Sequence, residues 1–179
     1  MGALATVHNL EIETKTGKVS VEQAETVKIT SSSANVTVGK FVLNATITTT
    51  SGDVTVGGNT LGGVLNIKTG TNGHVKATNL GGATTISSGG KISAVFANVL
   101  GKIDIAGTSK EINVVVPNGV TTTTNHIWVE SQKKSATIAI NGLENTGKKY
   151  RSVESVPVDE EYKLIKITST SGKITLKSK

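Results

Sequence analysis

Apolar and polar residues alternate along most of this chain, and the alternation is organised in a repeated unit. The unit reads Ile, any residue, Thr or Ser, any residue, Thr or Ser, Gly, any residue, Val, any residue, Val, as in residues 12–21 and 47–56. Its leading isoleucines advance by 17, 18, 20, 19 and 17 residues: Ile12, Ile29, Ile47, Ile67, Ile86 and Ile103. A final copy, 167–176, follows a long interruption. An internal repeat of this length is typical of solenoid folds.

The alternation predicts how the units stack. Side chains two apart in a strand share one face, so the Ile, Thr or Ser and Val positions face inward and the polar residues between them face outward. One coil cannot bury its inner face alone, but coils stacked about 4.8 Å apart can. We therefore expect two buried ladders: Ile12, Ile29, Ile47, Ile67 and Ile86, and Val19, Val36, Val54, Val75 and Ile92.

The predicted fold class is all-β: a single-stranded parallel β-solenoid of about seven coils with a C-terminal cap. The crossover preference of parallel strands predicts a right-handed coil. The alternative, an antiparallel β-sandwich, would not require the same residue classes in the same order in successive units. Each unit also carries a corner hydrophobe in its connecting piece: Ala24, Phe41, Leu61, Leu80, and Val99 or Leu100.

The pattern divides one solenoid domain, 1–179, into three parts. Residues 1–117 form regular coils, 118–163 form an irregular excursion and cap, and 164–179 form a closing strand pair. Because an open solenoid end exposes unpaired backbone groups, we expect Trp128 and the excursion to cap the C-terminal end. The closing pair, with Ile167, Ile174 and Leu176, is expected to add the terminal rungs and cover the coil beneath it.

Two segments carry a family resemblance. Thr49 to Val56 and Ile167 to Leu176 both contain a Ser-Gly-x-Ile/Val-x-Val/Leu element, and Pro117-Asn118-Gly119 follows the apolar run 114–116. Over nearly the whole chain these features resemble the DUF4097 family of bacterial adhesin-like repeat proteins. The resemblance implies a β-helix on the outside of a bacterial cell, often tethered to the membrane. It supplies no functional residues. Bactofilins, which are cytoplasmic polymerising β-helices, are less similar.

Composition narrows the function classes. The formal net charge is +6, but Lys carries it almost alone, with Arg151 as the single arginine, and aromatic residues make up 3%. Nucleic-acid readers rely on arginine forks and stacking aromatics, so no nucleic-acid partner is expected. The chain has no Cys, which excludes disulfides and Cys-based metal sites. No apolar run is long enough to span a membrane, so we expect any membrane tether to lie outside this chain.

The sequence predicts no catalytic residue, cofactor or metal site. His8, His74 and His126 lie far apart, without an acidic partner at metal-ligand spacing. β-Helix enzymes that act on polysaccharides need clustered carboxylates, whereas Asp53 and Asp104 belong to units three apart. The acidic run 159–161 and the basic run 148–151 are interpreted as solvated loops, although the basic run has the charge to contact an anionic wall polymer.

These observations favour a non-enzymatic binding or adhesion module of the bacterial cell surface or envelope. Its expected partners are a cell-wall polymer, a glycan or a cell-surface protein, and its expected location is extracellular or in the envelope, with a cytoplasmic location as the alternative. The second hypothesis is a structural β-helix that assembles end to end, as bactofilins do. A carbohydrate-active β-helix enzyme is a third. The ends of the stack discriminate the first two: a covered last coil favours a binding module and a bare one favours a polymer.

Overall fold

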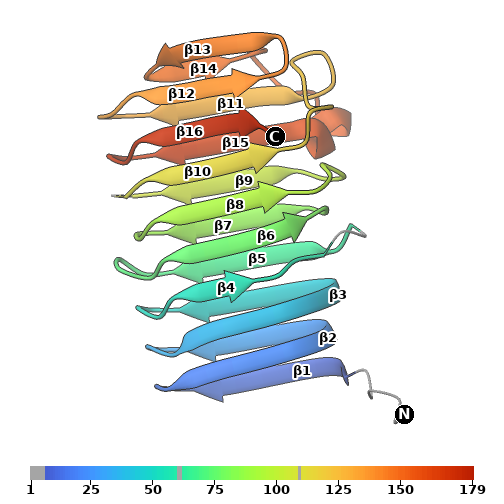
Figure 1. Cartoon of the computed structure of the whole chain (residues 1–179), viewed down its shortest axis with the longest axis vertical. Coiled ribbons are helices and arrows are strands. Elements are labelled where there is room, and N and C mark those ends of the chain that lie inside the picture. The colour runs from blue at the N-terminus through green and yellow to red at the C-terminus, as the bar shows by residue number, and fades with distance from the viewer. Residues whose placement is uncertain (1–6, 60–61, 109) are drawn as a thin grey trace.

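The computed structural model describes residues 7–59, 62–108 and 110–179, and these residues form a tall stack of β-strands (Figure 1). One short 3₁₀ helix, η1 (Val158–Lys163), interrupts the strand order. The strands are β1 (Val7–Thr14), β2 (Lys18–Ser31), β3 (Asn35–Thr49), β4 (Val54–Val56), β5 (Val64–Thr69), β6 (Val75–Leu80), β7 (Thr84–Ser88), β8 (Ile92–Phe96), β9 (Ile103–Gly107), β10 (Ile112–Val116), β11 (His126–Ser131), β12 (Ala136–Ile140), β13 (Leu143–Gly147), β14 (Lys149–Arg151), β15 (Leu164–Ser169) and β16 (Ile174–Ser178).

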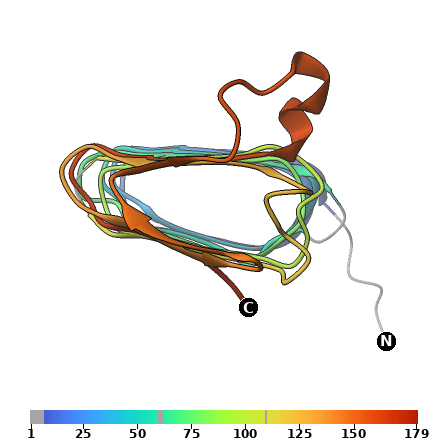
Figure 2. The same cartoon turned by 90° about the horizontal axis from the view of Figure 1, so that it is seen from above.

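The strands form two faces that enclose the core. The odd-numbered strands from β5 to β11, with β15, continue one face, and the even-numbered strands from β4 to β12, with β16, continue the other. The long strands β2 and β3 bend round a corner and contribute to both faces, so the cross-section is a flattened ring (Figure 2). In Figure 1, β4, β6, β8 and β10 cross the near face from left to right while the chain rises, which makes the coil right-handed.

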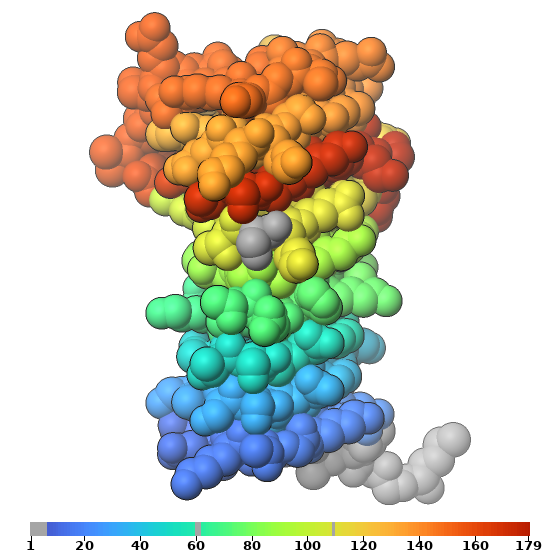
Figure 3. All heavy atoms as spheres, turned by 90° about the vertical axis from the view of Figure 1, so that its left-hand side faces the viewer, coloured from blue at the N-terminus to red at the C-terminus, as the bar shows by residue number. Residues whose placement is uncertain are grey.

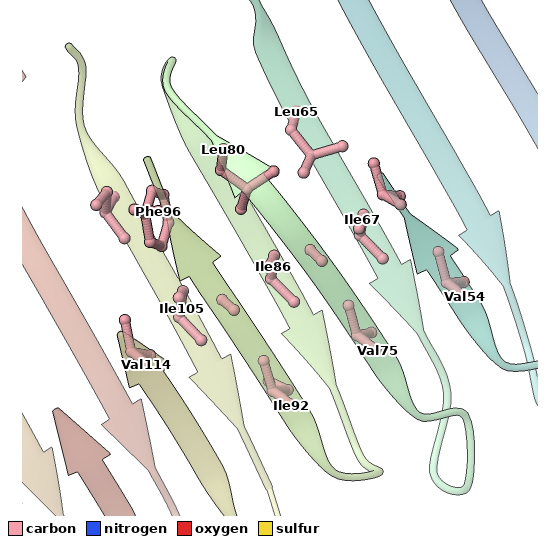
Figure 4. Packing of buried hydrophobic residues seen from close by; sticks show 14 of the residues in the cluster. Val54, Leu65, Ile67, Val75, Leu80, Ile86, Ile92, Phe96, Ile105 and Val114 are labelled. Atoms are coloured by element: carbon pink, nitrogen blue, oxygen red, sulfur yellow. The ribbon is translucent and has the colours of Figure 1, made fainter. Parts of the chain in front are cut away.

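The predicted solenoid and both predicted ladders are confirmed. Parallel pairing aligns Ile12 with Ile29, and the same ladder continues through Ile47 and Ile67 to Ile86. The valine ladder runs in register from Val19 to Ile92 on the other face. Except for Ile12 in the partly exposed first coil, these side chains are buried (Figure 4). The two ladders therefore form the core that the alternation requires.

The sixth unit begins two residues later than the sequence spacing suggests. Ile86 pairs with Ile105, not Ile103, so that Ile103 lies opposite Thr84. The outward neighbour of the ladder is accordingly Ala106 in place of Asp104. The repeat is harder to read here because Gly107 occupies the position of the inward Ser or Thr. The Ile112 side chain approaches to 2.8 Å of where a Cβ of Gly107 would lie.

The repeated Ser or Thr and the Gly after it shape the turn between the two faces. The Thr49 hydroxyl accepts a hydrogen bond from the backbone N–H of Gly52 at 3.1 Å, and the Ser169 hydroxyl accepts one from Gly172 at 2.7 Å. A Cβ at Gly52 would lie 1.8 Å from the carbonyl oxygen of Ala34 in the coil below. The motif thus satisfies a buried hydroxyl and lets successive turns stack closely.

The closing strand pair is not at the end of the stack, which corrects the prediction. β15 pairs with both β9 and β11, and β16 pairs with both β10 and β12. The last coil of the sequence is therefore inserted between two earlier ones. In Figure 3 the dark red C-terminal turn lies between the yellow and orange turns. Correspondingly, 126–131 and 136–140 form a regular coil above it; both lie within the predicted excursion, where the alternation at 127–129 and 136–140 indicates strands.

The cap also differs from the prediction. β13 and β14 turn antiparallel to β12 and β11 and close the C-terminal end of the stack. Leu143 and Tyr150 are the cap side chains that pack against the core. Trp128 does not cap the core, because it occupies an outward position on β11 between Ile127 and Val129, which are buried.

The corner hydrophobes are confirmed in part. Ala24 pairs with Phe41, and Leu80 pairs with Phe96; all four are buried. Phe96 takes the place predicted for Val99 or Leu100, and Leu100 is 60% exposed. Leu61 lies outside the described residues. The Phe96 ring fills the corner within its own strand, Val99 is partly buried against the core, and Leu100 points outward.

Candidate ligand-binding surface

The most distinctive outward-facing group lies on the odd-numbered face, around Trp128. In register, Trp128 of β11 lies opposite Arg151 of β14 on one side and Lys166 of β15 on the other. The guanidinium carbon of Arg151 is 3.5 Å from the centre of the indole ring, and the Lys166 ammonium is 5.3 Å from it. Both distances are within the range of cation–π interactions. The half-buried indole is therefore held between cations from two neighbouring strands.

Glu130 fixes the orientation of this group. The indole N–H of Trp128 donates a hydrogen bond to a Glu130 carboxylate oxygen at 3.3 Å, and a terminal nitrogen of Arg151 lies 3.7 Å from the same oxygen. Lys149 lies opposite Glu130 in the β11–β14 register. The arrangement thus combines three cations, one aromatic ring and one carboxylate on three adjoining strands, β14, β11 and β15.

A shallow hollow of about 370 Å³ adjoins this group. The hollow forms over Ala106, because this side chain is smaller than Ser87 and Thr168, which lie beside it on the two neighbouring strands. The Trp128 indole and the Lys166 side chain line one side of the hollow. The rest of its lining includes hydroxyl and amide side chains, namely Ser87, Thr108, Gln132, Thr168 and Thr170. Donors and acceptors of this kind bind hydroxyl-rich ligands, and the cations add an attraction for negative charge.

The basic run 148–151 was interpreted as a solvated loop, and this was wrong. Residues 149–151 form β14, Tyr150 packs against the core and Arg151 covers the indole. Sequence reasoning assigned Trp128, with the excursion around it, to the C-terminal cap. The alternation of side chains along the strand could have placed Trp128 outward. Ile127 and Val129 face inward, and the residue between two inward residues of a strand faces out.

The acidic run 159–161 is also structured, in η1. Glu160 bonds to Lys163 and His126, both at 2.7 Å, and Glu161 contacts Lys102 at 3.2 Å. The hydrogen bond from Lys163, together with that from His126, lowers the pKa of Glu160. These contacts attach η1 to the coils it passes, and they correct the interpretation of this run as a solvated loop.

The three histidines lie in three separate places. His8 contacts Glu25 at 2.8 Å, and the hydrogen bond with this carboxylate raises the pKa of His8. His74 lies in a turn ladder: its backbone N–H donates to Asp53 at 2.8 Å, and its Nδ1 accepts from the backbone N–H of Lys91 at 2.9 Å. Asp53 is therefore a turn residue, whereas Asp104 faces outward on β9 opposite Lys166. Within the described ranges, no three His, Asp or Glu side chains group so as to hold a metal ion.

Comparison with known proteins identifies the family. A family model described as Toastrack DUF4097 matches residues 4–177. The chain belongs to the Toastrack DUF4097 family. No curated protein and no solved structure matches it. Over the part of this Toastrack chain that the structure describes, no helix has the length and apolar character needed to cross a bilayer.

Proposed function

We propose that this Toastrack protein is a non-enzymatic binding module of the bacterial cell envelope, and that the surface around Trp128 binds an anionic cell-wall glycan. The supporting observation is the indole held between Arg151 and Lys166 beside a hydroxyl-lined hollow. A repeating, hydroxyl-rich polymer suits a long flat face whose outward rows are mostly Thr, Ser and Lys, because each rung offers a similar set of hydrogen-bonding groups.

The covered C-terminal end favours this function over end-to-end assembly. β13 and β14 lie antiparallel on the last parallel coil, and Leu143 and Tyr150 occupy the end of the core. A second molecule cannot continue the parallel ladder there without displacing these two strands. The asymmetric ends therefore suit a module that works through its sides.

The carboxylates argue against the third hypothesis, a carbohydrate-active enzyme. Glycoside hydrolysis uses two carboxyl groups about 5 to 10 Å apart across one scissile bond. Near the hollow, Glu130 is bound to Trp128 and lies by Arg151. Asp104 is two rungs from Glu130 and two residues along the strand, and it lies opposite Lys166. Glu130 lines the hollow and Asp104 does not, so the two carboxylates do not face each other across it.

The test is a binding screen on immobilised polymers: a neutral glucan, a polyuronic acid and a phosphate-containing wall polymer. We expect the two anionic polymers to bind, with affinity falling as salt rises, and the neutral glucan to bind at least tenfold more weakly. Lys166→Gln should weaken binding about tenfold. The matched control is Lys76→Gln, which removes the same charge from the opposite face. Equal affinity of the two variants for every polymer would refute the assignment of this face.

A further inference from the structure

Three Asn-Gly dipeptides occur in the chain, and they lie in three different settings. Asn72-Gly73 belongs to the turn between β5 and β6, Asn118-Gly119 begins the crossover from β10 to β11 (Figure 1), and Asn141-Gly142 joins β12 to β13. In such a dipeptide the backbone nitrogen of the glycine can attack the side-chain amide carbon of the asparagine, because no Cβ on the glycine hinders the approach. The packing around each dipeptide decides whether the folded chain permits this reaction.

The first dipeptide is locked within the stacked turns. Gly73 is buried, and a Cβ on it would lie 2.6 Å from the carbonyl oxygen of Gly52 in the coil below. The hydroxyls of Thr69 and Ser88 both donate hydrogen bonds to the carbonyl oxygen of Gly73, at 3.0 and 2.7 Å. Closing a succinimide ring between Asn72 and Gly73 requires new backbone dihedral angles, and the close packing of these turns opposes that change.

The third dipeptide is restrained through its own side chain. Residues 141–142 form the tight turn between Ile140 and Leu143, which pair in the β12–β13 ladder. The side-chain nitrogen of Asn141 donates a hydrogen bond to the backbone carbonyl oxygen of Asn118 at 2.7 Å. The side chain of Asn141 must leave this bond before its amide carbon can reach the next backbone nitrogen, so the contact opposes reaction at this position.

The second dipeptide is open to solvent. Asn118 and Gly119 are both exposed, and a Cβ on Gly119 would meet nothing within 4 Å. The turn is held by a hydrogen bond from the backbone N–H of Val120 to the carbonyl oxygen of Pro117 at 3.1 Å. Over the residues that the structure describes, neither the side-chain amide of Asn118 nor the N–H of Gly119 has a hydrogen-bond partner. The attacking nitrogen and the carbon that it attacks are therefore both available.

The hydrogen bond from Asn141 also favours this attack. The Gly119 N–H must lose its proton, and the resulting negative charge is shared between that nitrogen and the carbonyl oxygen of Asn118. Asn141 donates its hydrogen bond to this same oxygen, so it stabilises the charge at the place where the charge develops. One contact thus restrains position 141 and promotes reaction at position 118.

We propose that Asn118 is a site of spontaneous deamidation, promoted by Asn141. The nitrogen of Gly119, having lost its proton to hydroxide, forms a bond to the side-chain amide carbon of Asn118. The bond from this carbon to the amide nitrogen breaks, and that nitrogen leaves as ammonia. Water then opens the cyclic imide at either carbonyl carbon, which gives aspartate or isoaspartate. The sum consumes one water, releases one ammonia and involves no oxidation or reduction, and the formal net charge falls from +6 by one.

The isoaspartate product should disturb the crossover. Its main chain runs through the side-chain carbon, so the backbone of the turn becomes longer by one atom. Val120, the residue after the dipeptide, is buried in the core. The longer turn must therefore disturb either the burial of Val120 or its hydrogen bond to Pro117.

The first experiment compares the three dipeptides in the folded protein. Cleavage after Lys places them in separate peptides, 69–76, 111–133 and 135–148, in which mass spectrometry detects conversion of the amide to a carboxylate. At mildly alkaline pH we expect Asn118 to react about tenfold faster than Asn72 or Asn141, because only its turn is free of restraint. In denaturant the three rates should agree within about threefold. A rate at Asn118 no higher than that at Asn72 in the folded chain overturns the proposal.

The second experiment changes the reacting groups. Gly119→Ala adds a Cβ that meets nothing in the fold but hinders the attacking nitrogen, so deamidation should slow about tenfold while the Tm stays the same. Asn141→Ala removes the hydrogen-bond donor and should slow deamidation at Asn118 about threefold. The matched control, Thr146→Ala, lies at an exposed position of β13 and should leave the rate unchanged. An equal or faster rate in Asn141→Ala refutes the promoting role of Asn141.

The third experiment tests the effect on the crossover. Ion exchange separates the deamidated forms from the parent chain, because they carry one more negative charge. Asn118→Asp is the matched control, since it has the same charge on an unchanged backbone. We expect the isoaspartate form to melt at a lower temperature than Asn118→Asp. An equal Tm for the two proteins would show that the turn accommodates the extra backbone atom, and would refute the predicted disturbance.

Discussion

Removing the inserted C-terminal coil should disrupt the stack at an internal position, not trim one end. β15 and β16 contribute four side chains that are fully buried, namely Ile165, Ile167, Ile174 and Leu176. At about 1.5 to 3 kcal/mol each, their burial is worth roughly 6 to 12 kcal/mol. This upper estimate equals the whole net stability of an ordinary domain. Deletion of 164–179 also leaves β9, β10, β11 and β12 each with an unpaired edge.

We therefore expect the truncated chain to lose the β11–β12 coil and its cap while the coils before Pro117 keep much of their structure. Far-UV circular dichroism reports the whole stack, and the fluorescence of Trp128, the only tryptophan, reports the coil above the gap. The emission should shift to longer wavelength in the truncated chain, and the protein should aggregate through its exposed strand edges. Unchanged emission and an unchanged Tm after truncation would refute this reasoning.

A milder change separates the inserted coil from a general loss of core. Ile167→Ala removes a fully buried side chain and should cost about 3 kcal/mol, or about 9 °C in Tm for a chain of this size. Its fluorescence transition should precede its circular dichroism transition, because the coil above β15 loses its support first. The control is Ile47→Ala, the same substitution in the same ladder low in the stack. There we expect no early fluorescence transition.

Three further predictions test the turns, η1 and the cap. Gly52→Ala should cost several kcal/mol, because its Cβ would lie 1.8 Å from a carbonyl oxygen, whereas Gly119→Ala meets nothing within 4 Å and should leave the Tm unchanged. The pKa of Glu160 is lowered in the folded chain. The contribution of this carboxylate to stability is therefore present above its ordinary pKa of 4.5 and is lost as the pH falls through its folded pKa. When Tm is measured from pH 7 to 3, it should fall less for Glu160→Gln than for the wild type. Tyr150→Ser should expose the C-terminal end of the core and increase aggregation, measured by light scattering.

The repeat was readable from the sequence because the same physical demand recurs in every coil. Ile29, Ile47, Ile67 and Ile86 occupy equivalent positions, and burial on one face with exposure on the other leaves an unambiguous period of two. The register was misjudged only in the sixth coil. There Gly107 replaces the inward hydroxyl, and Ile103 and Ile105 both satisfy the pattern.

The order of the coils in space was not readable, for the same reason. A ladder position requires Ile or Val from any coil, so the residue type of Ile167 does not decide whether it stacks on Ile105, on Val129 or between them. What decides its place is three-dimensional: 117–125 cross over one rung, and 152–163 return outside the ring through η1 (Figure 2). Connection geometry of this kind leaves no periodic signal in the sequence.

The candidate site was missed through a related ambiguity. Trp128 was assigned to the C-terminal cap, although it lies between Ile127 and Val129, which face inward, and therefore faces outward. Its cationic neighbours come from segments 23 and 38 residues away, since 151 − 128 = 23 and 166 − 128 = 38. Neither separation equals the 17 to 20 residues of one repeat, although the strands are direct neighbours, because β14 is antiparallel and β15 is inserted. A site built across non-repeating connections cannot be inferred from repeat spacing.

The insertion also links the candidate site to completion of the fold. Lys166 lies on the inserted strand β15, Trp128 on the coil above it and Arg151 on the cap. Since β15 and β16 are the last strands in the sequence, these three side chains meet only after the C-terminal coil has entered its place. A ligand that bridges Lys166 and Arg151 binds the inserted state alone, so it must stabilise that state by mass action. The surface that we assign to binding is therefore complete only when the inserted coil is in place.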